Sequence, residues 1–145
     1  MGGCLVRRKL ALDRPIITAM SRTVTIVRLY DALTPEKGDT AYRVFIDRLW
    51  PRGVAKKDFV FDQWCKDLAP SQELRQWFGH KASRWETFSK RYRDELQTRE
   101  QQDRLADLVK QAGDHSIVLL YGAKDTTHNH AIVLAQALRT ALKHK

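Results

Sequence analysis

The stretch SIVLLY at residues 116–121 decides the fold of this chain. It is almost wholly apolar, which is typical of a strand that is buried on both faces of a parallel sheet. The run TVTIVRL at residues 23–29 is rich in β-branched side chains and predicts a second buried strand. RVFID at residues 43–47 predicts a third, short strand. Residues 59–64 carry three aromatic side chains and are compatible with a strand, a helical turn, or one after the other.

Helical spacing of apolar residues dominates the sequence between and after these strands. Ser71 is a good N-cap for a helix over residues 71–79, and an aromatic stripe predicts a second helix over residues 85–98. A third apolar stripe ends at Gly113, a typical helix C-cap, and a last helix closes the chain. The pattern predicts the α/β class: a small three-layer sandwich in which helices flank a short, mostly parallel sheet.

Length and composition exclude several classes of protein. A chain of 145 residues and 16.8 kDa is the size of one domain. No stretch approaches the ~18 apolar residues of a membrane helix, so we expect no membrane partner. Cys4 and Cys65 are too few for a disulfide framework, and no CxxC pair suggests structural zinc. We therefore expect a cytoplasmic protein.

Residues 1–19 differ from the rest of the chain. They show no periodic apolar pattern, and Met20 stands just before the first predicted strand. We expect residues 1–19 to be a disordered extension, and residues 20–145 to form a single α/β domain.

The charge of the chain is strongly positive. Its 26 Lys and Arg outnumber its 17 Asp and Glu, which gives a net charge of +9. Such a surplus favours a phosphate-bearing partner, either a small molecule or a nucleic acid. The alternative is that the positive charge only keeps the protein soluble and binds no partner.

The segment DRLWPRG at residues 47–53 follows a predicted strand and carries the clearest site signal. Arg48 and Arg52 supply planar groups suited to phosphate or carboxylate, and Trp50 offers a face for a ring. Asp47 is able to orient an arginine, hold a hydroxyl or act as a base. The structural alternative is that Asp47 pairs with Arg48 inside the fold while Trp50 fills a gap in the core.

The segment YGAKDTTHNH at residues 121–130 joins the apolar strand to the last helix. The N–H groups at a helix start attract anions, whereas Asp125 either takes part in the chemistry or caps the helix. His128 and His130 are two residues apart, unlike the i, i+4 histidines of zinc proteases. We expect neither a metal nor another cofactor.

Four longer segments together resemble the YeaO-like branch of the DUF488 family, and the likeness runs from Ser21 to Leu142. They are RVFIDRLWPRG, WCKDLAPSQELRQWFGH, RWETFSKRYRDEL and LLYGAKDTTHNHAIVL. The resemblance implies a compact bacterial α/β domain and names no reaction.

The resemblance also implies a set of characteristic polar positions, which we predict to share one pocket at the strand exits. In this set Asp47 and Asp125 are the candidate catalytic residues. The candidate substrate-binding residues are Arg48, Trp50, Arg52, Lys66, Ser71, Arg75, Tyr121 and Asn129. Lys66, Ser71 and Arg75 either line the pocket or brace the helix over residues 71–79.

Three functions fit this pattern. The first is an enzyme that acts on a nucleotide, a nucleoside or a nucleic-acid end. The second is a non-catalytic module that binds an anionic ligand or a nucleic-acid backbone. The third is a protein-interaction domain in which the charged cluster is structural.

Overall fold

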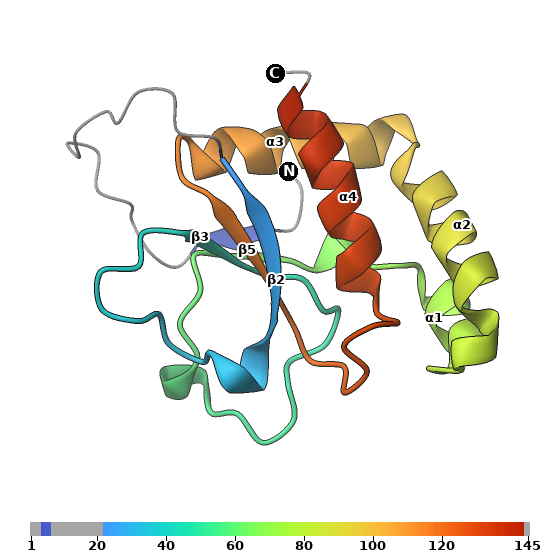
Figure 1. Cartoon of the computed structure of the whole chain (residues 1–145), viewed down its shortest axis with the longest axis horizontal. Coiled ribbons are helices and arrows are strands. Elements are labelled where there is room, and N and C mark those ends of the chain that lie inside the picture. The colour runs from blue at the N-terminus through green and yellow to red at the C-terminus, as the bar shows by residue number, and fades with distance from the viewer. Residues whose placement is uncertain (1–3, 7–21, 144–145) are drawn as a thin grey trace.

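The sheet at the centre of the molecule has five strands within the described part of the chain. The structure is a computed structural model, and it describes residues 4–6 and 22–143 (Figure 1). The strands are β1 (Cys4–Val6), β2 (Val24–Arg28), β3 (Tyr42–Phe45), β4 (Gln63–Cys65) and β5 (Ile117–Tyr121). Their order across the sheet is β1-β4-β3-β5-β2. The strands β4, β3, β5 and β2 run parallel, and β1 pairs antiparallel with β4, so the predicted mostly parallel sheet is confirmed.

Strand β5 lies in the middle of the parallel pairs. Leu119 is in register with Ile26 of β2 on one side and with Val44 of β3 on the other. Every residue of β5 is buried, as its apolar sequence predicts. A strand with neighbours on both sides and cover on both faces has no room for polar side chains.

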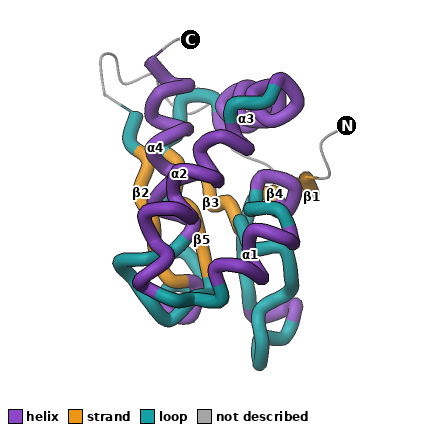
Figure 2. The backbone as a smooth tube through the Cα atoms, turned by 90° about the vertical axis from the view of Figure 1, so that its right-hand side faces the viewer, coloured by secondary structure: helices purple, strands orange, loops and turns teal. Residues whose placement is uncertain are grey.

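All four α-helices of the described residues pack against one face of the sheet (Figures 1 and 2). They are α1 (Gln72–Phe78), α2 (Trp85–Leu96), α3 (Arg99–Ala112) and α4 (His130–Lys143). The Ser71 side chain caps α1 by accepting a hydrogen bond from the Leu74 N–H at 3.2 Å, as predicted. Gly113 has a φ of 60° and ends α3, also as predicted.

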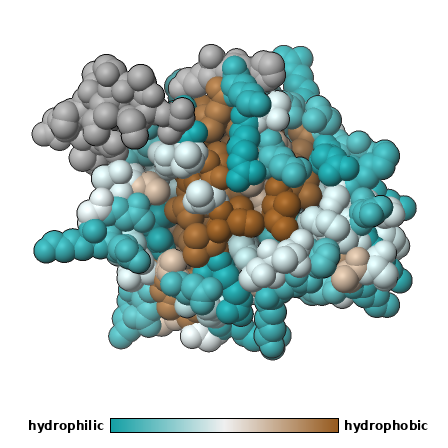
Figure 3. All heavy atoms as spheres, viewed as in Figure 1, coloured by the Kyte–Doolittle hydropathy of each residue, from teal (hydrophilic) through white to brown (hydrophobic). Residues whose placement is uncertain are grey.

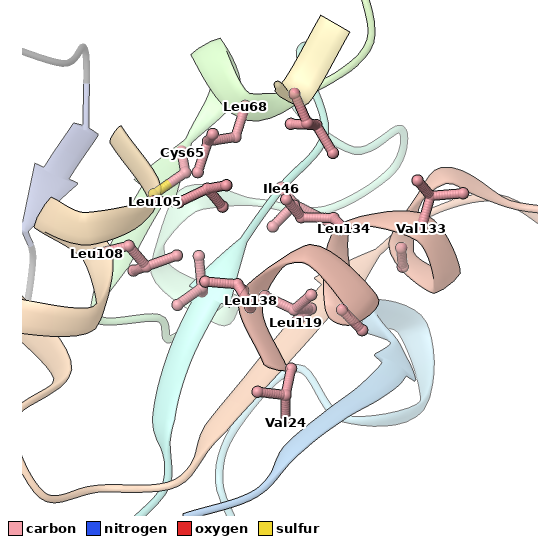
Figure 4. Packing of buried hydrophobic residues seen from close by; sticks show 14 of the residues in the cluster. Val24, Ile46, Cys65, Leu68, Leu105, Leu108, Leu119, Val133, Leu134 and Leu138 are labelled. Carbon is pink, nitrogen blue, oxygen red and sulfur yellow. The ribbon is translucent and has the colours of Figure 1, made fainter. Parts of the chain in front are cut away.

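The core between the helices and the sheet consists mainly of aliphatic side chains. Figure 4 shows Leu108 of α3 and Leu138 of α4 among side chains of the sheet, which include Val24 and Leu119. The predicted stripe of α2 also faces this core: Phe88 is buried and stacks on Phe78, with ring centroids 4.2 Å apart. On the surface seen in Figure 3, hydrophobic atoms gather along the seam between β2 and α4.

The other face of the sheet is covered by loops. An aromatic cluster built on Phe45, Phe59 and Phe61 packs there, with Leu120 of β5 beneath it. Its covering segments are the connections after β2 and β3, which include short 3₁₀ turns at Leu29–Asp31 and Lys56–Asp58. The α/β sandwich is confirmed, and its third layer consists of loops and 3₁₀ turns instead of α-helices.

The chain before β2 is described only in part. Residues 1–3 and 7–21 lie outside the described residues, so the expected extension is seen only at Cys4–Val6. These three residues form β1, a strand that the sequence did not predict, and Leu5 is in register with Trp64 of β4. In the described part of the chain, every helix is too short or too polar to cross a membrane.

Candidate functional site

The carboxyl ends of the parallel strands meet at one edge of the sheet, and a pocket opens there. Strands β3 and β5 lie side by side, and the chain leaves them at Phe45 and Tyr121. The pocket has a volume of about 460 Å³ and lies between the residues after these strands, α1 and the start of α4. This is where open parallel sheets usually bind ligands.

Six of the ten predicted site residues line the pocket. They are Asp47, Arg48, Trp50, Arg52, Arg75 and Asn129. The parallel strand directions bring the first four and Asn129 to the same edge, and α1 contributes Arg75. The other four predicted residues are not among the lining residues.

Asp47 ties the exits of two strands together. Its Oδ2 accepts a hydrogen bond from the Gly122 N–H at 2.9 Å, so the second residue after β3 holds the first residue after β5. Nε2 of His130 lies 3.1 Å from Asp47 Oδ1 and 3.3 Å from the Ile46 carbonyl oxygen. Among the described residues, no aligned hydrogen bond reaches Oδ1. Asp47 therefore contacts Gly122 and His130, whereas the structural alternative had paired it with Arg48.

Arg48 and Arg75 bring positive charge into the pocket, and among the described residues no salt bridge joins either of them to a carboxylate. An Nη of Arg48 donates to the carbonyl oxygen of Pro70 at 3.4 Å. Pro70 directly precedes Ser71, the N-cap of α1. The Nε atoms of Arg48 and Arg75 are buried and have no hydrogen-bond partner in the part of the chain that the structure describes. A buried donor without a partner costs about 1–3 kcal/mol. Holding both arginines in the pocket wall therefore lowers the stability of the folded chain.

Trp50 and Arg52 form the wall on the loop side. The Trp50 indole N–H donates to the Val54 carbonyl oxygen at 2.7 Å, and its ring packs edge-on against Phe45. Trp50 is thus anchored in the aromatic cluster and lines the pocket as well. The Arg52 side chain is exposed, and its carbonyl oxygen accepts a hydrogen bond from the Tyr30 hydroxyl at 2.8 Å.

Lys66, Ser71 and Tyr121 have other surroundings. Lys66 is exposed, and its Nζ lies 5.3 Å from the centre of the Trp64 ring. The Ser71 hydroxyl caps α1 and donates to Glu95 Oε2 at 2.6 Å, so it joins α1 to α2. Tyr121 is buried in the core, and this burial raises the pKa of its hydroxyl.

Asp125 organises the turn that leads into α4. Its Oδ1 accepts hydrogen bonds from the backbone N–H groups of Thr127 at 2.9 Å and His128 at 3.0 Å. The Thr127 N–H is the main cause that lowers the pKa of Asp125 to about 2. Asn129 then caps α4, because its Oδ1 accepts from the Ala131 N–H at 3.0 Å. Hydrogen bonds in this turn therefore explain the positions of the Asp125 and Asn129 side chains, although Asn129 also lines the pocket.

The pocket contains side chains that the sequence did not single out as binding residues. His80 and Gln76 come from α1 and the turn after it. His80 has a φ of 58°, a left-handed conformation that is uncommon for a residue other than glycine. In the sequence, His130 was weighed only as a metal ligand. Its position next to Asn129, where the strand leads into the last helix, could have indicated that it lines the pocket. Among the described residues, no three His, Cys, Asp or Glu side chains are grouped to hold a metal ion.

The fold and the pocket define a small parallel α/β domain with a cationic site at the carboxyl edge of its sheet. The family model DUF488-N3i, described as the "Inactive DUF488-N3 subclade", matches residues 23–145. The chain belongs to the DUF488 family.

Bacterial relatives cover most of the same region. "Uncharacterized protein YeaO" of Escherichia coli is 45% identical over 114 residues, which is 78% of this chain and 94% of the relative. "Uncharacterized protein Mb3100c" of Mycobacterium bovis and "Uncharacterized protein Rv3073c" of Mycobacterium tuberculosis are each 38% identical over 115 residues, which is 79% of this chain and 92% of each relative. The resemblance to the YeaO-like branch is thereby confirmed. No solved structure matches the chain significantly.

Proposed function

We propose that this domain is a non-catalytic module that binds a small phosphate-bearing molecule in the pocket at the carboxyl edge of the sheet. The observation that carries the proposal is the pair of buried, unpartnered Nε atoms of Arg48 and Arg75. An oxyanion bound by both guanidinium groups would accept their N–H groups once the side chains turn their Nε–Nη edges toward it. Binding would then relieve the cost of the unpartnered donors.

The charge of the pocket supports an anion. Among its described lining residues there are three arginines, and Asp47 is the one carboxylate. That carboxylate is already engaged by the Gly122 N–H and lies beside His130. Positive charge that no protein group neutralises favours an anionic ligand, and Arg is well suited to phosphate because its donors match the oxygens pairwise.

Two observations favour binding over catalysis. The matching family model carries the word "inactive" in its description. Asp125, one of the two candidate catalytic carboxylates, is held by backbone N–H groups in the turn before α4 and is not among the lining residues. Enzymatic action on a nucleotide remains the competing hypothesis, with Asp47 as its acid or base. We also infer a cytoplasmic location, because two cysteines are too few for a disulfide framework.

The test is thermal stabilisation of the full chain by a panel of inorganic phosphate, sugar phosphates and nucleotides, followed by titration calorimetry of each hit. A ligand at 100 times its Kd stabilises the folded state by about 2.7 kcal/mol. Arg75→Gln should reduce affinity at least tenfold without loss of stability, because its Nε has no partner to lose. Arg93→Gln, on the exposed side of α2, is the matched control and should bind normally.

Three results would contradict the proposal. The first is a panel in which no anion stabilises the chain. The second is unchanged affinity in the Arg75 variant. The third is turnover of a hit, detected by product analysis, which would favour the enzyme hypothesis over a non-catalytic module.

A further inference from the structure

The pocket is larger and more apolar than a phosphate ion needs. Its volume of about 460 Å³ lies within the roughly 300–1,000 Å³ of sites that bury whole organic ligands. Arg48 and Arg75 can account for one charged group of such a ligand. The rest of the pocket therefore requires a different explanation.

Part of the remaining wall is apolar, and this part comes from both layers of the fold. Phe78 and Phe88 contribute from the helical side, and Trp50 and Pro51 contribute from the loop side. The two aromatic side chains on the helical side stack on each other, and Trp50 is fixed by its hydrogen bond to Val54. These contacts within the protein hold the rings in place, so the apolar wall is preformed.

Leu49 extends this apolar wall outward. It is 69% exposed, and it is the large hydrophobic side chain that the described residues leave in solvent. A single exposed leucine is ordinary on a protein surface. Leu49, however, stands between the pocket residues Arg48 and Trp50 and itself lines the pocket. A ligand body in contact with Leu49 would remove its side chain from water, which favours binding.

On the basis of the proposed function, we infer that the ligand is a phosphate monoester whose phosphate is attached close to an aromatic or alicyclic ring. The phosphate contacts Arg48 and Arg75, and the ring lies against the apolar wall between Trp50 and Phe78, with Leu49 over its outer edge. The aromatic side chains suit a ring, because ring pairs gain from offset and edge-on packing beyond the area they bury.

The experiment compares three probes on the full chain by titration calorimetry: inorganic phosphate, glycerol phosphate and phenyl phosphate. Glycerol phosphate has a polar body on the same headgroup and serves as the matched control. We expect phenyl phosphate to bind at least tenfold tighter than glycerol phosphate, a difference of about 1.4 kcal/mol. Leu49→Ser should weaken phenyl phosphate about threefold or more and leave inorganic phosphate unchanged. Leu49→Met should restore the affinity, since its volume and apolar character are similar.

The outcomes separate this inference from the proposed function. If inorganic phosphate binds but phenyl phosphate binds no tighter than glycerol phosphate, the ring is wrong and the anion site stands. If Leu49→Ser weakens all three probes equally, the apolar contact is likewise refuted. If none of the three probes binds, this inference fails, and the proposed function fails as well only if no member of the larger thermal-stabilisation panel stabilises the chain. Because Leu49 is exposed, its variants should fold normally, and an unchanged Tm verifies this in the same samples.

Discussion

Gly122→Ala should disturb the contact that joins the exits of β3 and β5. A Cβ at this position would lie 2.9 Å from Asp47 Oδ2, closer than real Cβ atoms come to other heavy atoms. The same oxygen accepts the Gly122 N–H at 2.9 Å. The backbone itself allows alanine, because Gly122 is not among the glycines with positive φ. The carboxylate must therefore move away and lose its hydrogen bond.

The size of the effect follows from two opposing contributions. A hydrogen bond to a charged group contributes about 1.5–3 kcal/mol. The Asp47 side chain is 22% exposed, so water can partly replace the lost hydrogen bond. We therefore expect the loss of this bond to cost about 1.5 kcal/mol of stability. Replacement of glycine by alanine also stabilises by about 0.4–1 kcal/mol through the unfolded chain. The net expectation is a loss of about 0.5–1 kcal/mol and a fall in Tm of roughly 2–4 °C.

A double-mutant cycle with Asp47→Ala isolates the contact. In a chain that lacks the carboxylate, the new methyl group has no oxygen to displace, and its other neighbours lie at ordinary distances of 3.7 Å from Leu29 and 3.8 Å from Tyr30. Gly122→Ala should then stabilise by about 0.4–1 kcal/mol, so the sign of its effect reverses. Urea unfolding of the four proteins measures this coupling. Equal destabilisation by Gly122→Ala in both backgrounds would show that the contact with Asp47 is not the cause of the effect.

Three further predictions concern the core, the turn before α4 and the extension. Phe88→Ala should destabilise by about 3–5 kcal/mol in urea unfolding, because the ring is buried; a loss below ~1 kcal/mol would argue against a core role. The pKa of Asp125 is about 2 in the folded chain and about 3.9 when unfolded, so its stabilising effect is present above pH ~4 and is lost as the pH falls through 2. Relative to Asp125→Asn, the wild-type chain should therefore lose stability between pH ~4 and ~2, and parallel pH profiles would contradict this. A chain without residues 1–19 should still fold with a Tm near that of the full chain, and a large fall would show that the pairing of β1 with β4 is essential.

The sequence was sufficient for the class of the fold and for most of its elements. An apolar run such as that of β5 has one stable environment, the middle of a covered sheet, and the aromatic stripe of α2 has one face to bury. The helix caps could also be predicted, because Ser71 and Gly113 make their capping contacts with residues only a few positions away. Strand exits gave the location of the pocket, since the carboxyl ends of parallel strands must share an edge.

The tertiary structure decided which polar residues meet. Asp47 and Asp125 looked alike as carboxylates after strands, yet one holds Gly122 across the pocket floor and the other holds the N–H groups of its own turn. Their different roles depend on atoms that the backbone brings to each carboxylate, and residue spacing does not encode those positions. The antiparallel strand β1 could not be predicted from the sequence either. Three residues are too few to show an alternating pattern, and they form a strand because they pair with the edge of β4. Likewise, Arg75 comes from a helix, and only the tertiary placement of α1 at the pocket brings its Nε to the same pocket as that of Arg48.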